Sequence, residues 1–185
     1  NEKITNEGIH LSYLPFILKA VAAALRQYPR LNSRMDSDAG QLTIFQDIHI
    51  NIAVDTPDGL MVPVIRDVSR KSLTELAGDI FEKTQKAKER SLQLDDFQGG
   101  TFTVTNYGSI GGTYGVPVIN YPQAAILGIG RIMKRPVVQG NQLAVGHVIP
   151  LSLSVDHRIV DGAESARFLR RVADLLAEPD TLLLV

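Results

Sequence analysis

Three segments of the chain carry apolar residues at helical spacing. They span residues 11–28, 72–90 and 162–177. Pro15 falls in the first turn of the first segment, where proline is tolerated, and Ser12 is placed to cap it. In the third segment the apolar positions fall on one face, which is typical of an amphipathic helix. The pattern therefore predicts three helices.

Shorter segments alternate between apolar and polar residues or are apolar throughout, which predicts strands. The predicted strands cover residues 41–46, 50–55, 59–65, 101–105, 124–132 and 148–156. Residues 28–36, YPRLNSRMD, interrupt the helical pattern. Strands and helices are mixed without strict alternation. This favours an α/β layered domain with a central mixed β-sheet flanked by helices over a doubly wound parallel sheet.

Composition narrows the class of protein. The 185 residues fit one domain, spanning 1–185, with a full core. The formal net charge is −1, so no basic excess points to nucleic acid. The chain has no cysteine, which excludes a disulfide framework, a zinc–thiolate site and a catalytic cysteine. No run is long enough to span a membrane and no signal peptide is recognisable, so we expect no membrane partner.

The stretch SVDHRIVDG, residues 154–162, places a histidine between a predicted strand and a predicted helix. Asp161 is well placed to cap that helix. His157 lies at the junction, where a side chain can project into a cleft and exchange a proton near neutral pH. The alternative is a histidine that is only hydrogen-bonded at a turn. The four histidines share no metal-ligand spacing, so we expect no metal site.

A second stretch, TFTVTNYGSIGG at residues 101–112, ends a strand on polar groups. Thr105 and Asn106 are the last of these groups before a glycine-rich loop. Such groups can donate hydrogen bonds to an oxyanion. The alternative is a threonine-rich strand followed by an ordinary glycine turn. The loop is a weak candidate for a phosphate cradle, because it lacks the lysine of that motif and opens no helix.

Taken together, these stretches resemble one family. YPRLN, DGLMVPVI, TFTVTNYGSIGG, INYPQAAILGIG, KRPVV and SVDHRIVDG occur in the order found in the catalytic domain of dihydrolipoamide acyltransferases, the core component of 2-oxo acid dehydrogenase complexes. The resemblance covers essentially the whole chain. It implies a fold like that of chloramphenicol acetyltransferase and homotrimers, with the active site between neighbouring subunits. The trimers would assemble into a larger cage that works with decarboxylase and dihydrolipoamide dehydrogenase components.

The resemblance also implies a reaction and a set of catalytic residues. An acyl group would pass between dihydrolipoamide and coenzyme A, with His157 as general base. Thr105 would be the oxyanion donor, at a position where the family often has serine. Asp161 occupies the acid position of the motif, and its alternative role is a plain helix cap. The sequence leaves the acyl group open between branched-chain and acetyl.

By position in the family's pattern, the coenzyme A contacts would be Ser12, Asp55, Asn106, Gly128 and Gly130. The alternative for the two glycines is tight strand packing. Lys134 and Arg135 could meet the nucleotide phosphates, but a solvated basic turn is favoured for them.

The resemblance also predicts what surrounds this domain. We expect an N-terminally truncated catalytic domain, with the lipoyl and peripheral subunit-binding domains of the family absent from this chain. The lipoyl group would be carried on one of them. The apolar C-terminal residues 181–185 would meet at two-fold contacts between trimers, unless they pack on the domain's own core. The expected location is the cytoplasm, or the mitochondrial matrix in a eukaryote.

Two other functions remain open from the sequence. A free-standing coenzyme A-dependent acetyltransferase acting on a small hydroxyl or amine would share His157. A structural core protein would keep the assembly surfaces without turnover. A serine hydrolase is disfavoured, because no G-x-S-x-G motif occurs in the chain.

Overall fold

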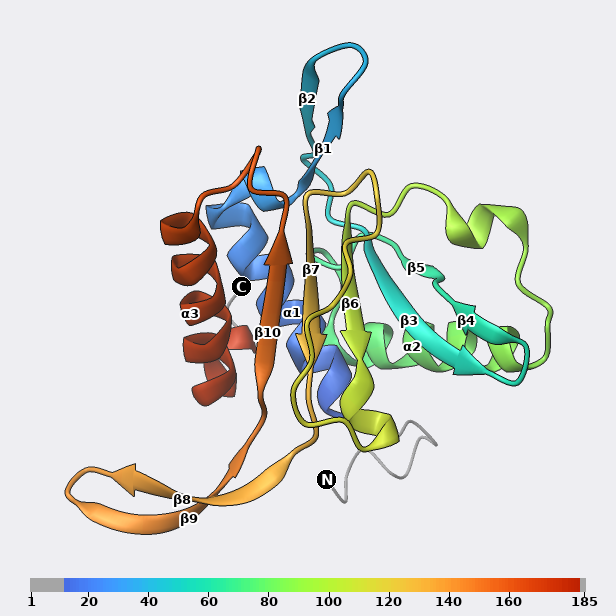
Figure 1. Cartoon of the computed structure of the whole chain (residues 1–185). Helices are drawn as coiled ribbons and strands as arrows, with labels where there is room; N and C mark the ends of the chain where they lie inside the picture. Colours follow the sequence, from blue (N-terminus) through green and yellow to red (C-terminus); the bar gives the residue numbers. More distant parts are fainter. Residues whose placement is uncertain (1–11, 184–185) are drawn as a thin grey trace.

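The computed structural model describes residues 12–183, which form a mixed sheet with helices packed on it (Figure 1). The six-stranded sheet has the order β10-β7-β6-β3-β4, with β5 also paired to β3. Pairs β3–β6 and β6–β7 are parallel, and the other pairs are antiparallel. The strands are β3 Ile50–Thr56, β4 Gly59–Met61, β5 Val64–Ile65, β6 Phe102–Asn106, β7 Ala125–Ile129 and β10 Leu151–Val155. The predicted mixed sheet is therefore confirmed.

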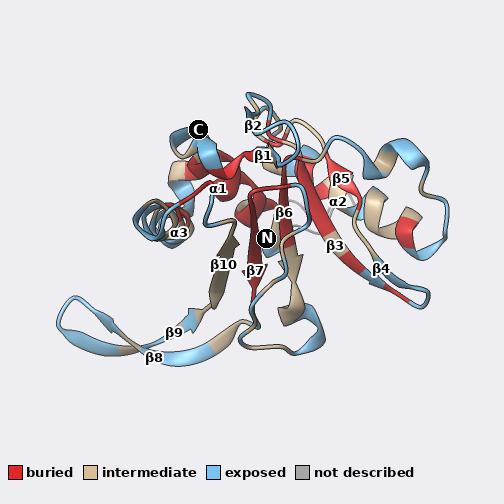
Figure 2. Ribbon diagram, turned by 45° about the horizontal axis from the view of Figure 1, so that its top comes forward, coloured by how far each residue is buried: buried red, intermediate tan, exposed pale blue. Residues whose placement is uncertain are grey.

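Three helices cover one face of this sheet. They are α1 Tyr13–Gln27, α2 Leu73–Lys88 and α3 Gly162–Ala177, and α1 contacts both of the others. Alternation along the strands sends one set of side chains toward the helices, where Phe102 lies 5.9 Å from the ring of Phe168 on α3. This is the buried core seen in red in Figure 2. None of the helices in the described residues is long and apolar enough to cross a membrane.

The opposite face of the sheet is polar, and the segment after β6 lies over part of it. Gln123 joins that segment to the sheet through buried hydrogen bonds. Its side chain accepts from the Thr103 hydroxyl at 2.5 Å. Its amide nitrogen donates to the Asn51 side chain at 2.7 Å and to the Gly100 carbonyl at 2.9 Å. These bonds hold the segment in place over the N-terminal ends of β3 and β6.

Two hairpins extend from the body (Figure 1). The first pairs β1 Ser33–Asp36 with β2 Gln41–Ile44, and the second pairs β8 Met133–Gln139 with β9 Gln142–Val148. The second is a separate two-stranded sheet that projects away from the domain as an arm. Isolated two-stranded ribbons are marginally stable in water.

The strand predictions were wrong at several places, and the single strand predicted over 59–65 is divided into β4 and β5. Residues 33–36, which were not predicted to form a strand, form β1 after the short 3-10 helix Pro29–Leu31. The strands β7 and β10 are shorter than the predicted 124–132 and 148–156, because β8 follows β7 and β9 precedes β10. The arm was missed because it packs on no core, so its strands lack the usual alternation. Lys134 and Arg135, expected in a solvated turn, are exposed residues of strand β8.

The C-terminal end of the described chain forms a 3-10 helix, Pro179–Leu183. Leu182 is 1% exposed and belongs to the core. At this position the side chain packs on its own domain, which was the alternative to the predicted two-fold contact between trimers. Residues 184 and 185 lie outside the described residues, as do residues 1–11.

Candidate active site

His157 lies at the tip of a turn between β10 and α3, and the rest of the turn is tightly held. The Asp156 N–H donates to the Ala124 carbonyl at 2.8 Å, and the Asp156 carbonyl accepts from the N–H groups of Ile159 and Val160 at 2.9 and 3.0 Å. His157 itself is exposed. The turn therefore presents an imidazole on a rigid base at the edge of the sheet.

An ion pair clamps the residues on either side of the imidazole. Arg158 donates to Asp156 through its backbone N–H at 3.0 Å and through two guanidinium nitrogens. These hydrogen bonds hold the pKa of the Asp156 carboxyl below its usual range. Asp156 and Arg158 thus orient the turn and leave the imidazole between them accessible.

Asp161 is the N-cap of α3. Its carboxylate accepts from the Glu164 backbone N–H at 2.8 Å, and this bond lowers the pKa of the carboxyl. The capping prediction is confirmed. The cap lies four residues after His157 and fixes where α3 begins, and so fixes the end of the turn that carries the histidine.

Thr105 lies near the end of β6 on the polar face of the sheet, half-buried. It lines a cavity of about 550 Å³ whose walls are mainly apolar, from β3, β4, β7 and the segment over the sheet. The cavity residues around it include Ala53, Leu60, Val62, Ile126, Val116, Pro117 and Val118. Thr103, Tyr107 and Tyr114 also line this cavity. A Thr105 hydroxyl in mainly apolar surroundings suits hydrogen bonding to a substrate oxygen.

Within one chain, Thr105 and His157 lie at opposite ends of the sheet. Thr105 pairs with Gly128, which pairs in turn with Ser152 on β10. His157 follows Ser152 by five residues, and the arrows of β6 and β10 point in opposite directions in Figure 1. Strand dimensions then separate Thr105 from the end of β10 by at least about 14 Å. One chain therefore cannot bring both side chains to the same reacting atom.

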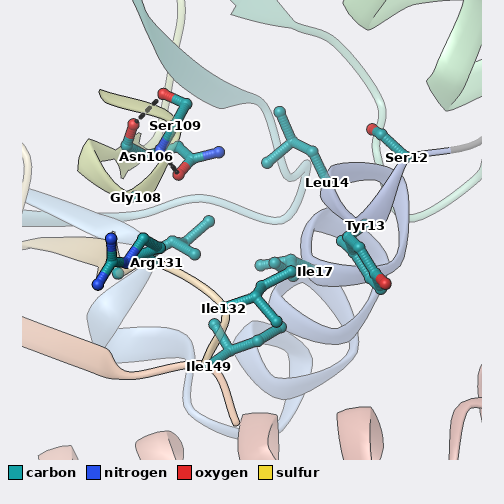
Figure 3. A pocket seen from close by; sticks show the side chains of 12 residues that line it. Ser12, Tyr13, Leu14, Ile17, Asn106, Gly108, Ser109, Arg131, Ile132 and Ile149 are labelled. Carbon is teal, nitrogen blue, oxygen red and sulfur yellow. Dashed lines mark hydrogen bonds between the residues drawn. The ribbon is translucent and has the colours of Figure 1, made fainter. Parts of the chain in front are cut away.

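A second cavity, of about 330 Å³, gathers three of the predicted coenzyme A contacts (Figure 3). Ser12 comes from the start of α1, Asn106 from the end of β6, and Gly130 from the residues after β7. Within the described residues Ser12 is the N-cap but makes no side-chain capping bond, so that part of its predicted role is wrong. Asn106 is partly engaged, because its side-chain oxygen accepts from the Ser109 N–H at 3.2 Å.

The other predicted contacts lie elsewhere. Asp55 is exposed on β3 and lines neither cavity. A Cβ on Gly128 would lie 2.7 Å from Cε1 of Tyr107, and a Cβ on Gly130 would lie 2.2 Å from the Thr113 carbonyl oxygen. The close approaches that these glycines allow are thus made by the protein itself, which supports the packing alternative.

Sequence reasoning missed two residues at these sites. Tyr107 lines the Thr105 cavity, and Arg131 lines the cavity with Ser12. Tyr107 comes directly after the end of the predicted strand and stands at the start of a loop. The sequence pattern at this position therefore gave no sign that the side chain lines a cavity. No cluster of histidine, cysteine or carboxylate side chains suited to a metal ion occurs among residues 12–183.

The layered mixed sheet with helices packed on one face defines a chloramphenicol acetyltransferase-like fold. The model of one family, the 2-oxoacid dehydrogenases acyltransferase (catalytic domain), matches residues 1–184, and the chain belongs to it. The predicted resemblance is therefore confirmed.

Named relatives agree with this assignment. The chain is 48% identical over 97% of its length to the dihydrolipoyllysine-residue acetyltransferase component of the pyruvate dehydrogenase complex of Acholeplasma laidlawii, and 45% identical over 96% to that of Pseudomonas aeruginosa. It spans about a third of the length of these relatives, 33% and 32%.

Solved structures show the same fold. The dihydrolipoamide acetyltransferase of Azotobacter vinelandii, studied for the role of a serine, a histidine and an asparagine in its catalytic mechanism, superposes with a TM-score of 0.92 at 42% identity, covering 97% of this chain and 74% of that one. A chloramphenicol acetyltransferase shares the fold, with a TM-score of 0.57 at 18% identity over 89% of this chain and 78% of that one.

Proposed function

We propose that this domain transfers an acetyl group between dihydrolipoamide and coenzyme A, as the core of a 2-oxo acid dehydrogenase complex. The observation that carries the proposal is the spacing of three residues on a shared fold. In the Azotobacter enzyme the serine precedes the histidine by 52 positions and the asparagine follows it by four. Here Thr105 and Asp161 stand at the same distances from His157. The acetyl choice is supported by the relatives, which are named acetyltransferases.

The chemistry follows from these groups. A thiol has a pKa of about 8.5, so the thiol of coenzyme A is mostly protonated at neutral pH. His157 takes its proton as the sulfur attacks the thioester carbonyl carbon. The carbonyl oxygen becomes an oxyanion that accepts a hydrogen bond from Thr105. When the bond to the dihydrolipoyl sulfur breaks, His157 returns the proton to that sulfur. The chain has no cysteine, so no acyl group rests on a protein thiol.

The active site on this proposal is shared between two copies. Because Thr105 and His157 of one chain lie at opposite ends of the sheet, a neighbouring copy must supply one of them. The arm formed by β8 and β9 supports such an assembly: it projects from the body and exposes Val138, Leu143 and Val145, each at least 71% accessible. Apolar side chains in that position are suited to contact a second copy.

We place coenzyme A with its thiol toward Thr105 and part of its chain in the cavity between Ser12, Asn106 and Arg131. The start of α1 and the Arg131 guanidinium give this cavity a positive end for an anionic ligand. Asp161 acts as a positioning residue through the cap of α3. Asp55 and Gly128 are left outside this arrangement.

Trimers, a larger cage, a lipoyl group on a domain outside this chain, and decarboxylase and dihydrolipoamide dehydrogenase partners belong to the same proposal. They are supported by the family and by a solved relative described as the cubic core of the pyruvate dehydrogenase multienzyme complex, which is 43% identical with a TM-score of 0.92 over 97% of this chain and 74% of that one. A cytoplasmic location stays a prediction.

The test is transfer from acetyl-, isobutyryl- and succinyl-coenzyme A to free dihydrolipoamide, with small alcohols and amines as competing acceptors. We expect transfer to dihydrolipoamide, fastest from acetyl-coenzyme A. Replacing His157 with Ala should lower kcat by about 10²–10⁴ with coenzyme A binding nearly unchanged, because a general base acts on the chemical step. Transfer only to alcohols or amines would favour the free-standing acetyltransferase, and no transfer would favour a structural core protein.

A further inference from the structure

Tyr107 has a seat made by three glycines. A Cβ on Gly128 would lie 2.7 Å from Cε1 of its ring, one on Gly115 3.2 Å from Cε1 and Cζ, and one on Gly112 3.0 Å from Cδ2. Side chains at these positions would collide with the ring or crowd it. The sheet and the loop over it are therefore shaped around this one aromatic side chain.

The ring lies beside Thr105. Thr105, Gly128 and Ser152 form a row across β6, β7 and β10, and the middle member has no side chain. Tyr107 fills the gap over Gly128, and its hydroxyl is 2.9 Å from the Ser152 hydroxyl. The side of the Thr105 cavity toward β10 is thus closed by an aromatic ring whose far end is held by a hydrogen bond.

The reacting carbonyl carbon has three substituents to place. Its oxygen must lie within hydrogen-bond reach of Thr105, at about 2.7–3.1 Å. The sulfur continues into a long chain that needs an open path to solvent. The remaining substituent is the alkyl part of the acyl group, which is short and has to fit the closed side. That side is the one that Tyr107 occupies.

We propose that Tyr107 is a specificity-determining residue that restricts the Thr105 site to small acyl groups such as acetyl. The inference rests on the proposed function and deepens it. The ring leaves room for a methyl group beside the oxyanion and excludes a branched chain. The close packing against Gly112, Gly115 and Gly128 holds the ring in that position.

The test compares kcat/KM for acetyl- and isobutyryl-coenzyme A, with dihydrolipoamide as acceptor, in the wild type and in Tyr107→Leu. We expect the isobutyryl-to-acetyl ratio to rise about tenfold or more, since one methylene in an apolar pocket is worth about 10- to 200-fold in discrimination. Tyr107→Phe is the matched control: it keeps the ring, so the ratio should stay within about twofold of the wild type.

The outcomes separate this inference from the proposed function. An unchanged ratio in Tyr107→Leu, with acetyl transfer still measurable, overturns the role of Tyr107 and leaves the proposed function standing. Absence of transfer from every acyl-coenzyme A in the wild type overturns both. If the Leu variant does not fold, Tyr107→Met replaces it, because a flexible unbranched side chain can fill part of the seat. The same rise in ratio is expected there, and an unchanged ratio contradicts the inference.

Discussion

Gln123 offers a direct test of how the wall of the Thr105 cavity is held. Its side chain is 8% exposed and makes three hydrogen bonds, to Thr103, Asn51 and Gly100. The substitution Gln123→Met keeps the length and the unbranched shape and removes all three. It leaves the Asn51 side-chain oxygen and the Gly100 carbonyl without this donor.

The expected loss follows from those two acceptors. A buried polar group left without its partner costs about 1–3 kcal/mol, so with two such groups Gln123→Met should lower the free energy of unfolding by about 2–6 kcal/mol. That is a large part of a typical domain stability of about 5–15 kcal/mol. Urea unfolding at pH 7 and one fixed protein concentration measures the loss, with Gln41→Met at an exposed strand position outside the arm as control. A change below about 0.5 kcal/mol in Gln123→Met, as for an ordinary surface position, would refute the reasoning.

The remaining predictions concern the site itself. Thr105→Val keeps the shape and removes the donor, so kcat should fall about 10²–10³ with little change in KM, while Thr105→Ser keeps most activity; equal behaviour of the two variants would exclude an oxyanion role. The pKa of Asp156 is lowered by hydrogen bonds from Arg158, so its stabilising contribution is present above the ordinary aspartate pKa of about 3.9 and is lost as pH falls through the lower folded value. The stability gap between wild type and Asp156→Asn in urea unfolding should therefore be constant from about pH 6 to 8 and close below about pH 4; a gap unchanged at pH 3 would contradict this.

Much of the fold was predictable because helical and strand periodicity report burial directly. Residues 50–55 show the pattern of a strand and residues 162–177 show apolar residues at helical spacing. Both elements formed as expected. The arm of β8 and β9 was not predictable in this way, because its strands face solvent on both sides within one chain. Its partner would be another copy, and a sequence contains no direct mark of such a contact.

The candidate site likewise has features that the sequence predicts and features that depend on the fold alone. His157 and the capping residue Asp161 are close in sequence, so the neighbouring strand and helix patterns were enough to place them. The distance between His157 and Thr105 depends on strand order, with β7 between β6 and β10, and no motif reports that order. Tyr107 was missed for a similar reason: its seat is assembled from glycines at 112, 115 and 128, which only the fold brings together.

The central claim is that each active site takes His157 from one copy and Thr105 from another. Co-expression of His157→Ala with Thr105→Val tests it most directly, because each variant alone lacks one essential group. A ring of copies formed by random mixing contains about a quarter of sites with both groups intact, so the mixture should recover about a quarter of wild-type transfer. Mixing the two variants after separate assembly is the control and should stay at the level of the parents. Co-expressed assemblies that contain both variants yet transfer no faster than either parent would contradict the shared site.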